Sequence, residues 1–435
     1  MFTMYTSRKK RQIIKPYNRI SVPDFKISSA KITAILVVAC LLCVNTTIFA
    51  SNRFNQDLSK LSPDSTVILH DESGTPLIAF NPETQQIPAS IIKIITAQAA
   101  LDLLGQGYRF KTDFFSDQNG NLIIKGWGDP FLISEEIEVI SAHLKEKGLV
   151  SVTQIFVDDS AFSEDVLIDG TSGTLNPYDA LNGALVVNFN TLFLGRNEDG
   201  TVYSAEDYTP LTPLALTKGE LIEPGKEERI NLAGNASESL QYVGQLFSAF
   251  FKEMNIPIGN DKVARREVDD RCTLLYRHES SKSLDFILMG LLKYSNNFIA
   301  NQLFLTLGAE KTDYPASLKK SRTVMNNYLS EKWHFNPGTL KFHEASGISR
   351  LNRVTGRQMI KVLESFKPFS HLLSRKDGIL LKSGTLSDIH NYAGYFETAT
   401  GLQPFVIITH QTTDKRDQIL EMLKAFNEHP EIFTN

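Results

Sequence analysis

Hydrophobic and polar positions are most regularly patterned near the two ends of the chain. Two β-rich runs within residues 65–80 surround an Asp-Glu-Ser-Gly turn and predict a hairpin. A stretch rich in helix formers then runs from Ser90 to Gly105, and glycine is a common C-terminal cap of a helix. Further strands are predicted at 379–382, 392–397 and 405–410, followed by an amphipathic helix at 417–428. These patterns indicate one sheet to which both ends of the chain contribute.

The middle of the chain has a different texture. Between 108 and 271, short β-like runs alternate with Gly, Asp and Pro turns, and the only clear helical stretch is 134–147. The β-like runs are 122–125, 154–157 and 185–188, and helices return at 284–293 and 298–307. We therefore expect an α+β fold in which residues 55–105 and 273–430 form an antiparallel sheet flanked by helices. Residues 106–272 are expected to form a large β-rich insertion of one or two subdomains.

The amino terminus is patterned like an export signal. Residues 1–50 hold eight basic side chains, one acid and an apolar run over 32–44, and they end at Ala50. A basic region, a short apolar run and a small residue at the cut are typical of a secretory signal peptide. The uncharged stretch is also just long enough to remain as a membrane anchor. We expect an exported protein that acts in the periplasm or at the outer face of the cytoplasmic membrane, with peripheral or N-terminal membrane association left open.

Charge and cysteine content exclude several classes of function. The residues after 50 carry 37 basic and 48 acidic groups, and such an acidic body argues against nucleic acid as the main partner. Two of the three cysteines lie in the apolar run, which leaves Cys272 as the only thiol of the expected folded body. A disulfide framework or a multi-cysteine zinc site is thereby excluded there, and no His-Glu-x-x-His pair occurs. We expect neither a metal nor another cofactor.

Ser90 and Lys93 form the first candidate for chemistry. Their spacing places a hydroxyl and an amine on one face of the expected helix. Serine becomes a nucleophile when a base takes its proton, and a lysine kept neutral by burial or by a nearby cation can be that base. The motif alone is weak, because Ser317 and Lys320 have the same spacing. The alternative interpretation is that Ser90 is a helix N-cap and Lys93 a solvated side chain.

Two further motifs follow in order. Ser295-Asn296-Asn297 lies between two helical runs, and Lys382-Ser383-Gly384-Thr385 ends a strand with apolar flanks. Taken singly, the first could be a polar turn and the second an edge-strand charge followed by a turn. Together with Ser90 and Lys93, they resemble the three-motif signature of the penicillin-recognising serine enzymes.

The chain resembles one family of these enzymes in particular, the class C low-molecular-mass penicillin-binding proteins, or D-alanyl-D-alanine carboxypeptidases/endopeptidases. The stretches that carry the resemblance are 125–130, 157–162, 182–190 and 345–353, and the similarity covers about residues 55–430. A large insertion between the first two motifs is the hallmark of this family. The resemblance implies a β-lactamase/transpeptidase-like domain with that insertion. It also implies peptidoglycan stem peptides and β-lactam antibiotics as partners.

The resemblance also implies catalytic roles. Ser90 would attack the carbonyl between two terminal D-alanines and become acylated, with Lys93 as general base. Ser295 would relay a proton to the departing amine, helped by the cation of Lys382. Asn297 would hydrogen-bond the acyl side of the substrate. Water would then release the acyl group.

Substrate-binding roles follow from the same resemblance. The segment Ser383, Gly384 and Thr385 would hold the terminal carboxylate together with the catalytic lysine of that strand. The N–H groups of Ser90 and Thr385 would form the oxyanion hole.

Arg350 and an acid of the Asp158/Asp159 pair, with Asp158 preferred, would bind the zwitterionic end of a meso-diaminopimelate in the stem peptide. The alternative is that Arg350 makes a surface ion pair.

The leading hypothesis is thus a serine D-alanyl-D-alanine carboxypeptidase/endopeptidase that works through an acyl-enzyme on Ser90. Two alternatives remain open at this point. One is a serine β-lactamase or esterase of the same superfamily, and the other is a non-catalytic wall-binding or sensor protein on the same fold. The preference between carboxypeptidase and endopeptidase action, and the oligomeric state, do not follow from the sequence.

Overall fold

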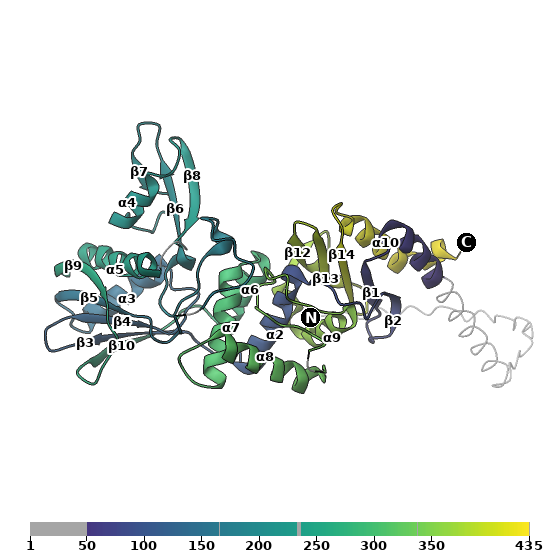
Figure 1. Cartoon of the computed structure of the whole chain (residues 1–435), viewed down its shortest axis with the longest axis horizontal. Helices are drawn as coiled ribbons and strands as arrows, with labels where there is room; N and C mark the ends of the chain where they lie inside the picture. The colour runs from purple at the N-terminus through teal and green to yellow at the C-terminus, as the bar shows by residue number, and fades with distance from the viewer. Residues whose placement is uncertain (1–49, 165, 233–235, 337, 435) are drawn as a thin grey trace, which may run out of the picture. The chain divides into compact units, whose positions relative to one another are not determined.

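The computed structural model describes residues 50–164, 166–232, 236–336 and 338–434 (Figure 1). The apolar run expected as an export signal or anchor therefore lies outside the described residues. Among the helices in the described ranges, none has both the length and the apolar character that a bilayer crossing requires.

A six-stranded antiparallel sheet is built from both ends of the chain, as expected. Its order is β11-β12-β13-β14-β1-β2, so the first hairpin is hydrogen-bonded to the last strand. The strands are β1 (Thr66–His70), β2 (Pro76–Phe80), β11 (Ser374–Lys376), β12 (Ile379–Leu386), β13 (Ile389–Glu397) and β14 (Leu402–His410). Pairing of β1 with β14 brings residues more than three hundred positions apart into register.

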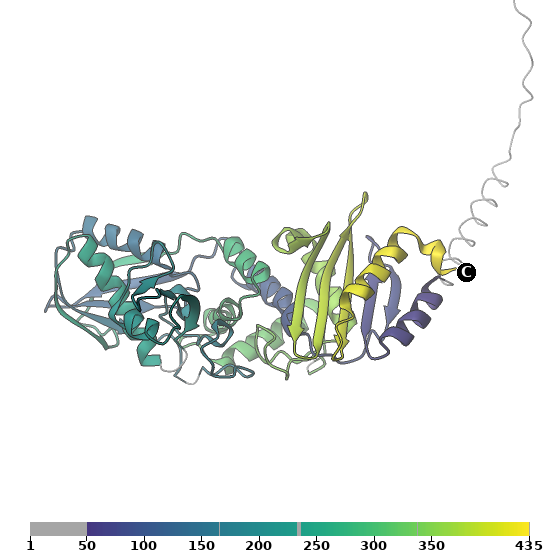
Figure 2. The ribbon, with the colours of Figure 1, turned by 90° about the horizontal axis from the view of Figure 1, so that it is seen from above.

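Helices cover both faces of this sheet (Figure 2). Because successive side chains of a strand point to opposite faces, Ile68, Val406 and Ile408 join one core while their neighbours join another. The first core contains α2 (Lys93–Leu103), α6 (Leu284–Lys293), α7 (Asn297–Lys311), α8 (Leu318–Trp333) and α9 (Gly356–Phe366). The second core contains a helix over residues 50–61 and α10 (Arg416–Glu428). The central strands β1 and β14 consist mainly of apolar residues because both their faces are buried.

The segment between α2 and α6 forms two further sheets. A five-stranded sheet has the order β10-β3-β4-β5-β9 and a three-stranded sheet the order β7-β6-β8. The five strands are β3 (Lys111–Ser116), β4 (Leu122–Gly126), β5 (Val152–Asp158), β9 (Ile258–Arg265) and β10 (Thr273–Glu279). The other elements are β6 (Thr191–Arg196), β7 (Val202–Ser204), β8 (Lys226–Asn231), α3 (Ser134–Glu146), α4 (Pro213–Gly219) and α5 (Ala236–Glu253). Residues of β10 belong to this sheet, although the sequence placed them in the following domain.

Two expectations for the middle segment are wrong. Residues 185–188 are not a strand, because the chain turns there through Asn188, Phe189 and Asn190, which all have positive φ. The 18-residue helix α5 is a second long helix of this segment. Its apolar side chains recur at helical spacing and pack into the core of the insertion. The α+β class itself is confirmed.

Candidate active site

Ser90 lies in a single 3-10 turn, Ala89–Ile92, which leads directly into α2. Ala89 has a φ of 46°, a value uncommon for a residue with a side chain, and such backbone strain is concentrated at functional sites. No side chain caps this turn or α2, so the alternative interpretation of Ser90 as an N-cap is wrong. Lys93 is fully buried, which also excludes the solvated lysine of that interpretation.

Nζ of Lys93 has three partners. It lies 2.9 Å from Oγ of Ser90, 2.9 Å from Oδ1 of Asn297 and 2.6 Å from the carbonyl oxygen of Ser346. Two of these partners can only accept, because they are carbonyl oxygens. A neutral amine that donates its two N–H groups to them therefore directs its lone pair to the hydroxyl of Ser90. This is the geometry that a general base requires.

The surroundings favour the neutral form of Lys93. Burial lowers the pKa of Lys93 well below its usual value, and the positive charge of Lys382 lowers that pKa further. The carboxylate of Glu344 acts in the opposite direction. Desolvation is the largest of the three effects.

Glu344 organises the loop that carries the Ser346 carbonyl, and the sequence did not indicate this role. The glutamate is fully buried and its carboxylate accepts hydrogen bonds from Asn301 Nδ2, Ser346 N, Ser346 Oγ, Gly347 N, Ser349 N and Asn352 Nδ2. A carboxylate buried in this way is stable because each oxygen is satisfied by several donors. The only sequence signal was position, since Glu344 directly precedes one of the stretches that carry the family resemblance.

Two glycines allow other segments to approach Ser90 closely. A Cβ on Gly347, which has a φ of +84°, would overlap with the carbonyl oxygen of Ala89. A Cβ on Gly384 would lie 3.0 Å from the backbone nitrogen of Ser90. Strand β12 and the Glu344 loop are therefore packed against the backbone of Ser90 from two directions.

The second motif lies at the junction of α6 and α7. Asn296 caps α7 through its side chain, and α7 begins at Asn297, whose Oδ1 meets Lys93. Ser295 has a φ of 53° just before this cap and is partly exposed. Nδ2 of Asn297 also lies 3.5 Å from the carbonyl of Tyr178, so the insertion reaches the edge of the site.

The third motif lies on β12. Lys382 is 3% exposed, donates to the carbonyl of Ser383 over 2.8 Å, and has its pKa lowered to about 8 by burial. Further along the strand, Oγ1 of Thr385 accepts a hydrogen bond of 2.7 Å from Nη1 of Arg416. Arg416 begins α10, stacks over the ring of Tyr392 and was not found from the sequence, because no motif links α10 to β12.

The expectation for Asp158 does not agree with its surroundings. This aspartate is fully buried at the end of β5, pairs with Lys125 over 2.9 Å and accepts hydrogen bonds from the backbone of Ser160 and Val268. The carboxylate of Asp158 therefore has all these partners inside the insertion. Burial alone would raise the pKa of Asp158, but the hydrogen bonds outweigh burial and lower that pKa. Asp158 does not line the cavity that contains Arg350.

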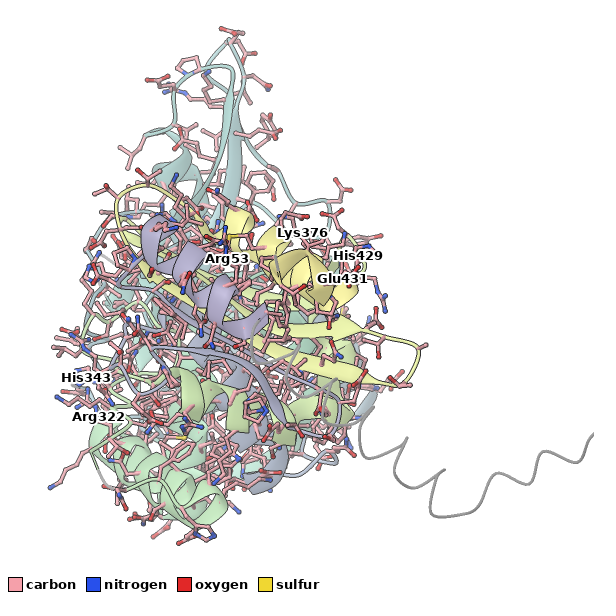
Figure 3. The ribbon with its side chains drawn as sticks, turned by 90° about the vertical axis from the view of Figure 1, so that its right-hand side faces the viewer. Arg53, Arg322, His343, Lys376, His429 and Glu431 are labelled. Carbon is pink, nitrogen blue, oxygen red and sulfur yellow. The ribbon has the colours of Figure 1, made fainter. Side chains whose placement is uncertain are left out.

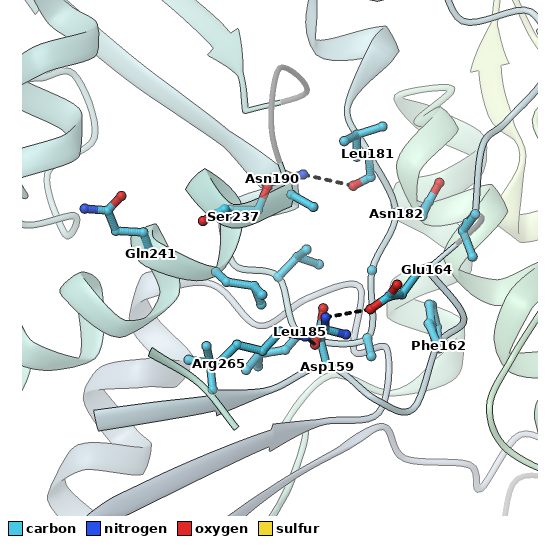
Figure 4. A pocket seen from close by; sticks show the side chains of 18 of the residues that line it. Asp159, Phe162, Glu164, Leu181, Asn182, Leu185, Asn190, Ser237, Gln241 and Arg265 are labelled. Carbon is cyan, nitrogen blue, oxygen red and sulfur yellow. Dashed lines mark hydrogen bonds and ion pairs between the residues drawn. The ribbon is translucent and has the colours of Figure 1, made fainter. Parts of the chain in front are cut away.

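Asp159 belongs to a separate cavity of about 720 Å³ inside the insertion (Figure 4). There it pairs with Arg265 over 2.6 Å, and Arg265 also pairs with Glu164. Neither member of the expected aspartate pair therefore lies beside Arg350.

Arg350 lines a cavity of about 690 Å³ formed by the insertion and by the loops next to β12. Its guanidinium donates to Ser387 Oγ over 2.9 Å and pairs with Asp388. Other lining residues include Asp169, Tyr178 and Leu351. The cavity is next to the motif residues, since Tyr178 contacts Asn297 and β12 continues into it.

A serine whose hydroxyl meets a buried lysine of lowered pKa, next to a second lysine on a sheet strand, defines a penicillin-recognising serine acyl-transfer enzyme. The model of the D-Ala-D-Ala carboxypeptidase 3 (S13) family matches residues 53–203 and 216–376. The chain therefore belongs to the D-Ala-D-Ala carboxypeptidase 3 (S13) family, and the resemblance seen in the sequence is confirmed.

Individual relatives agree with this assignment. The D-alanyl-D-alanine carboxypeptidase DacB of Haemophilus influenzae is 25% identical over 420 residues, which cover 81% of this chain and 87% of the relative. A D-alanyl-D-alanine carboxypeptidase of Actinomadura sp. is 24% identical, over 68% of this chain and 63% of the relative. The crystal structure of penicillin-binding protein 4 (dacB) from H. influenzae has a TM-score of 0.68 at 20% identity and covers 86% of this chain and 98% of its own. At this level of identity, the structural similarity shows that the two proteins share a fold.

Proposed function

We propose that this chain is an exported serine D-alanyl-D-alanine carboxypeptidase and endopeptidase that cleaves peptidoglycan stem peptides through an acyl-enzyme on Ser90. The observation that carries the proposal is the 2.9 Å contact between Oγ of Ser90 and Nζ of the fully buried Lys93. A buried lysine without a carboxylate in contact is a base at neutral pH. The family supplies the substrate class, a D-Ala-D-Ala bond.

Acylation begins with transfer of the Ser90 proton to Lys93. The serine oxygen then bonds to the carbonyl carbon between the two D-alanines, and the carbonyl oxygen becomes negatively charged. Backbone N–H groups of Ser90 and Thr385 stabilise this charge, and each such donor is typically worth about 3–4 kcal/mol in the transition state. The close approach of Gly384 to the Ser90 nitrogen supports this placement of the two donors.

Departure of the terminal D-alanine requires a proton on its amine. Ser295 donates this proton to the amine. Ser295 then takes up a proton from Lys93 or Lys382, which share the proton removed from Ser90. The C–N bond then breaks and leaves the acyl-enzyme. Water attacks the ester in the second half of the reaction and returns the hydroxyl proton to Ser90 through Lys93.

Recognition of the free carboxylate is assigned to the end of β12. Hydroxyls of Ser383 and Thr385 and the ammonium of Lys382 surround the place where the carboxylate would lie. Arg416 adds a guanidinium through its 2.7 Å hydrogen bond to Thr385. Arg416 is itself paired with Asp414 over 3.1 Å, and together with Lys382 and the two hydroxyls it forms a suitable site for one carboxylate.

The acyl side of the substrate is assigned to the cavity that contains Arg350. Arg350 offers a guanidinium to the carboxylate of the third residue of the stem peptide, and Ser387 adds a hydroxyl. Asp169 also lines this cavity and is exposed, so it takes the role first expected of Asp158 as partner of the ammonium. This arrangement is suited to the zwitterionic end of meso-diaminopimelate.

The proposal includes β-lactam antibiotics as acylating partners and a location outside the cytoplasm. A cell-wall peptidase needs access to its polymer, and the basic and apolar pattern of residues 1–50 is typical of an export signal. Neither a metal nor an organic cofactor takes part in the steps above.

The test is intact-mass analysis after incubation with a labelled penicillin, followed by peptide mapping. We expect one adduct, on Ser90. Ser90→Ala should prevent the adduct and lower peptidase activity by roughly three orders of magnitude or more. Ser317→Ala is the matched control, because Ser317 has the same spacing to a lysine but caps α8, while Lys320 pairs with Asp313. An adduct on Ser317, or full activity of Ser90→Ala, would refute the assignment.

A further inference from the structure

A smaller cavity of about 390 Å³ lies between α8 and the loop that follows it. Its lining includes Arg322, Asn326, Lys341, His343, Leu351 and Arg353, and we call it the cationic pocket. Figure 3 labels Arg322 and His343 beside each other at the surface. No acidic residue is part of the lining. This is unusual in a chain whose body is strongly acidic.

Two of the cations lie directly opposite each other. Lys341 and Arg353 form an isolated antiparallel bridge, with N–H···O distances of 2.9 Å and 3.0 Å in the two directions. Residues paired in this way have neighbouring side chains, and like charges placed directly opposite are destabilising. An anion held between the two side chains would convert this repulsion into attraction.

None of the three cations is neutralised within the described part of the chain. Arg322 donates to the carbonyl and to Nε2 of His343, at 2.8 Å and 3.2 Å. Arg353 donates to the backbone carbonyls of Arg350 and Asn352. No ion pair involves Arg322, Lys341 or Arg353 among the described residues.

His343 also lines the cationic pocket and accepts from Arg322 through Nε2. Burial and the charge of Arg322 lower its pKa, while Asp169 and Glu344 act in the opposite direction. Neither acid lines the cationic pocket, since Asp169 faces the cavity that contains Arg350 and Glu344 holds the loop beneath the active site. The positive potential of the cationic pocket is thus left available to a ligand.

The cationic pocket is also adjacent to the cavity that contains Arg350, because the two share a lining residue. Leu351 lines both this pocket and the cavity that contains Arg350. Residues 350–353 therefore lie between the cationic pocket and the cavity that contains Arg350. An extended polymer that enters the first cavity would reach the second.

From these features we propose that the cationic pocket is an exosite for an oxyanion of the polymeric substrate, held by Lys341, Arg353 and Arg322. The inference rests on the proposed function for the identity of the polymer. Two sources offer the same chemistry, a carboxylate of a neighbouring stem peptide and a phosphate of an anionic polymer attached to the wall. Planar guanidinium groups bind either one with paired hydrogen bonds.

Lys341→Gln and Arg353→Gln are the probes, and Lys262→Gln is the matched control. Lys262 is exposed on β9, makes no ion pair with a described residue and does not line the pocket. Each enzyme is assayed on a soluble pentapeptide, on cross-linked sacculi stripped of attached anionic polymers, and on sacculi that retain them. Melting temperatures are measured in phosphate and in chloride at equal ionic strength, so that inorganic phosphate serves as a direct probe.

We expect the two probe variants to lose roughly three- to tenfold in activity on sacculi and to match the wild type on the pentapeptide, as for a charge-assisted contact to the polymer alone. A loss on stripped sacculi identifies a carboxylate, and a loss only on untreated sacculi identifies a phosphate. Phosphate should raise the melting temperature of the wild type more than that of Lys341→Gln.

The proposal is overturned if both probe variants behave as Lys262→Gln does on every substrate and in phosphate. Failure of the proposed function is distinguishable from this outcome. If the wild type cleaves no pentapeptide, the peptidase assignment fails, while the phosphate measurement still decides whether the pocket binds oxyanions.

Discussion

The carbonyl oxygen of Ser346 accepts a hydrogen bond from Nζ of Lys93 over 2.6 Å, although 253 positions separate the two residues. With Oδ1 of Asn297, this carbonyl occupies both N–H groups of the neutral amine. The lone pair is then left for Ser90. The basic residue of the first motif is therefore oriented by the second motif and by a loop that belongs to none of the three.

The rate of acylation should first rise and then fall as the pH increases. The rate should rise with pH as Lys93 loses its proton, because only the neutral amine can accept the proton of Ser90. It should fall again around pH 8, because burial lowers the pKa of Lys382 to about 8 and the cation of that residue is needed to bind the carboxylate. Stopped-flow acylation by a chromogenic β-lactam across this range is the measurement.

Lys382→Arg gives the control for the descending limb. Arginine keeps its charge at every accessible pH, so this variant should be slower but should lose the alkaline limb. A rate that stays constant from mildly acidic to mildly alkaline pH in the wild type would contradict the role of Lys93.

Glu344→Gln should change both stability and the pH profile. The carboxamide keeps the shape but loses a buried charge that accepts six hydrogen bonds, so we expect a loss of about 3–5 kcal/mol in the free energy of unfolding. Glu344 raises the pKa of Lys93, so its removal should move the rising limb of acylation to lower pH. Denaturant unfolding and the acylation profile measure the two effects.

Glu136→Gln is the control for this prediction. Glu136 is also buried, and its carboxylate accepts from His278 and Ser281 in the insertion. Its replacement should destabilise the protein without moving the acylation limb. An unchanged limb in Glu344→Gln would mean that Glu344 supports the loop but does not act on Lys93.

Candidate site residues could be proposed from the sequence where side-chain identity carries the chemistry. Ser90, Lys93, Asn297 and Lys382 could be proposed because their types and order are informative before folding, and the structure brings the first three into contact. The Ser346 carbonyl could not be found, because every residue has one and only the folded loop brings it to Lys93. Arg416 was missed for a similar reason, since it meets Thr385 only after α10 packs onto the sheet.

The errors in the fold have physical causes as well. Residues 185–187 are Leu, Val and Val, an apolar and largely β-branched run as in a strand, but they lie buried where the insertion core meets a turn with three positive φ values. Burial alone explains their composition there. Helix α5 contains Gly244 in its centre, which weakens the local helix signal, and a side chain at that position would collide with Val263 of β9. The strands β12, β13 and β14 were predicted correctly because both their faces are apolar.

Gly347→Ala should impair acylation strongly. The new methyl group would overlap with the carbonyl of Ala89 and lie 2.9 Å from the nitrogen of Ser90, so the nucleophile has to move. Gly378→Ala is the matched control, because Gly378 has a similar φ of +80° and a methyl group there would meet nothing within 4 Å. Both variants should lose about 1–2 kcal/mol in stability through the positive φ, and only Gly347→Ala should lose penicillin acylation. Equal acylation by the two would contradict the close packing at Ser90.

Arg416→Gln should weaken binding of substrates that end in a free carboxylate. The loss of one charge-assisted contact should raise KM for a D-Ala-D-Ala peptide by roughly tenfold. The same peptide with an amidated C-terminus should be cleaved poorly and equally by both enzymes. Arg375→Gln is the control, because Arg375 is an exposed arginine of β11 that pairs with Glu397 at the end of β13. A similar fractional loss on both peptides would show that Arg416 acts through the fold of α10 instead.

Arg350→Ala should separate peptide recognition from chemistry. Arg350 lines the acyl-side cavity, is 47% exposed and makes no contact with Ser90 or Lys93, so penicillin acylation should be unchanged. For a pentapeptide with diaminopimelate at the third position, kcat/KM should fall by roughly tenfold, because one paired carboxylate contact is lost. A pentapeptide with lysine there lacks that carboxylate and should be affected much less. Arg357 lies on α9 and forms an exposed ion pair with Glu83. Arg357→Ala breaks that pair and should change neither reaction. If Arg350→Ala instead slows penicillin and both peptides equally, Arg350 serves only its ion pair with Asp388, and the acyl side of the substrate is recognised elsewhere.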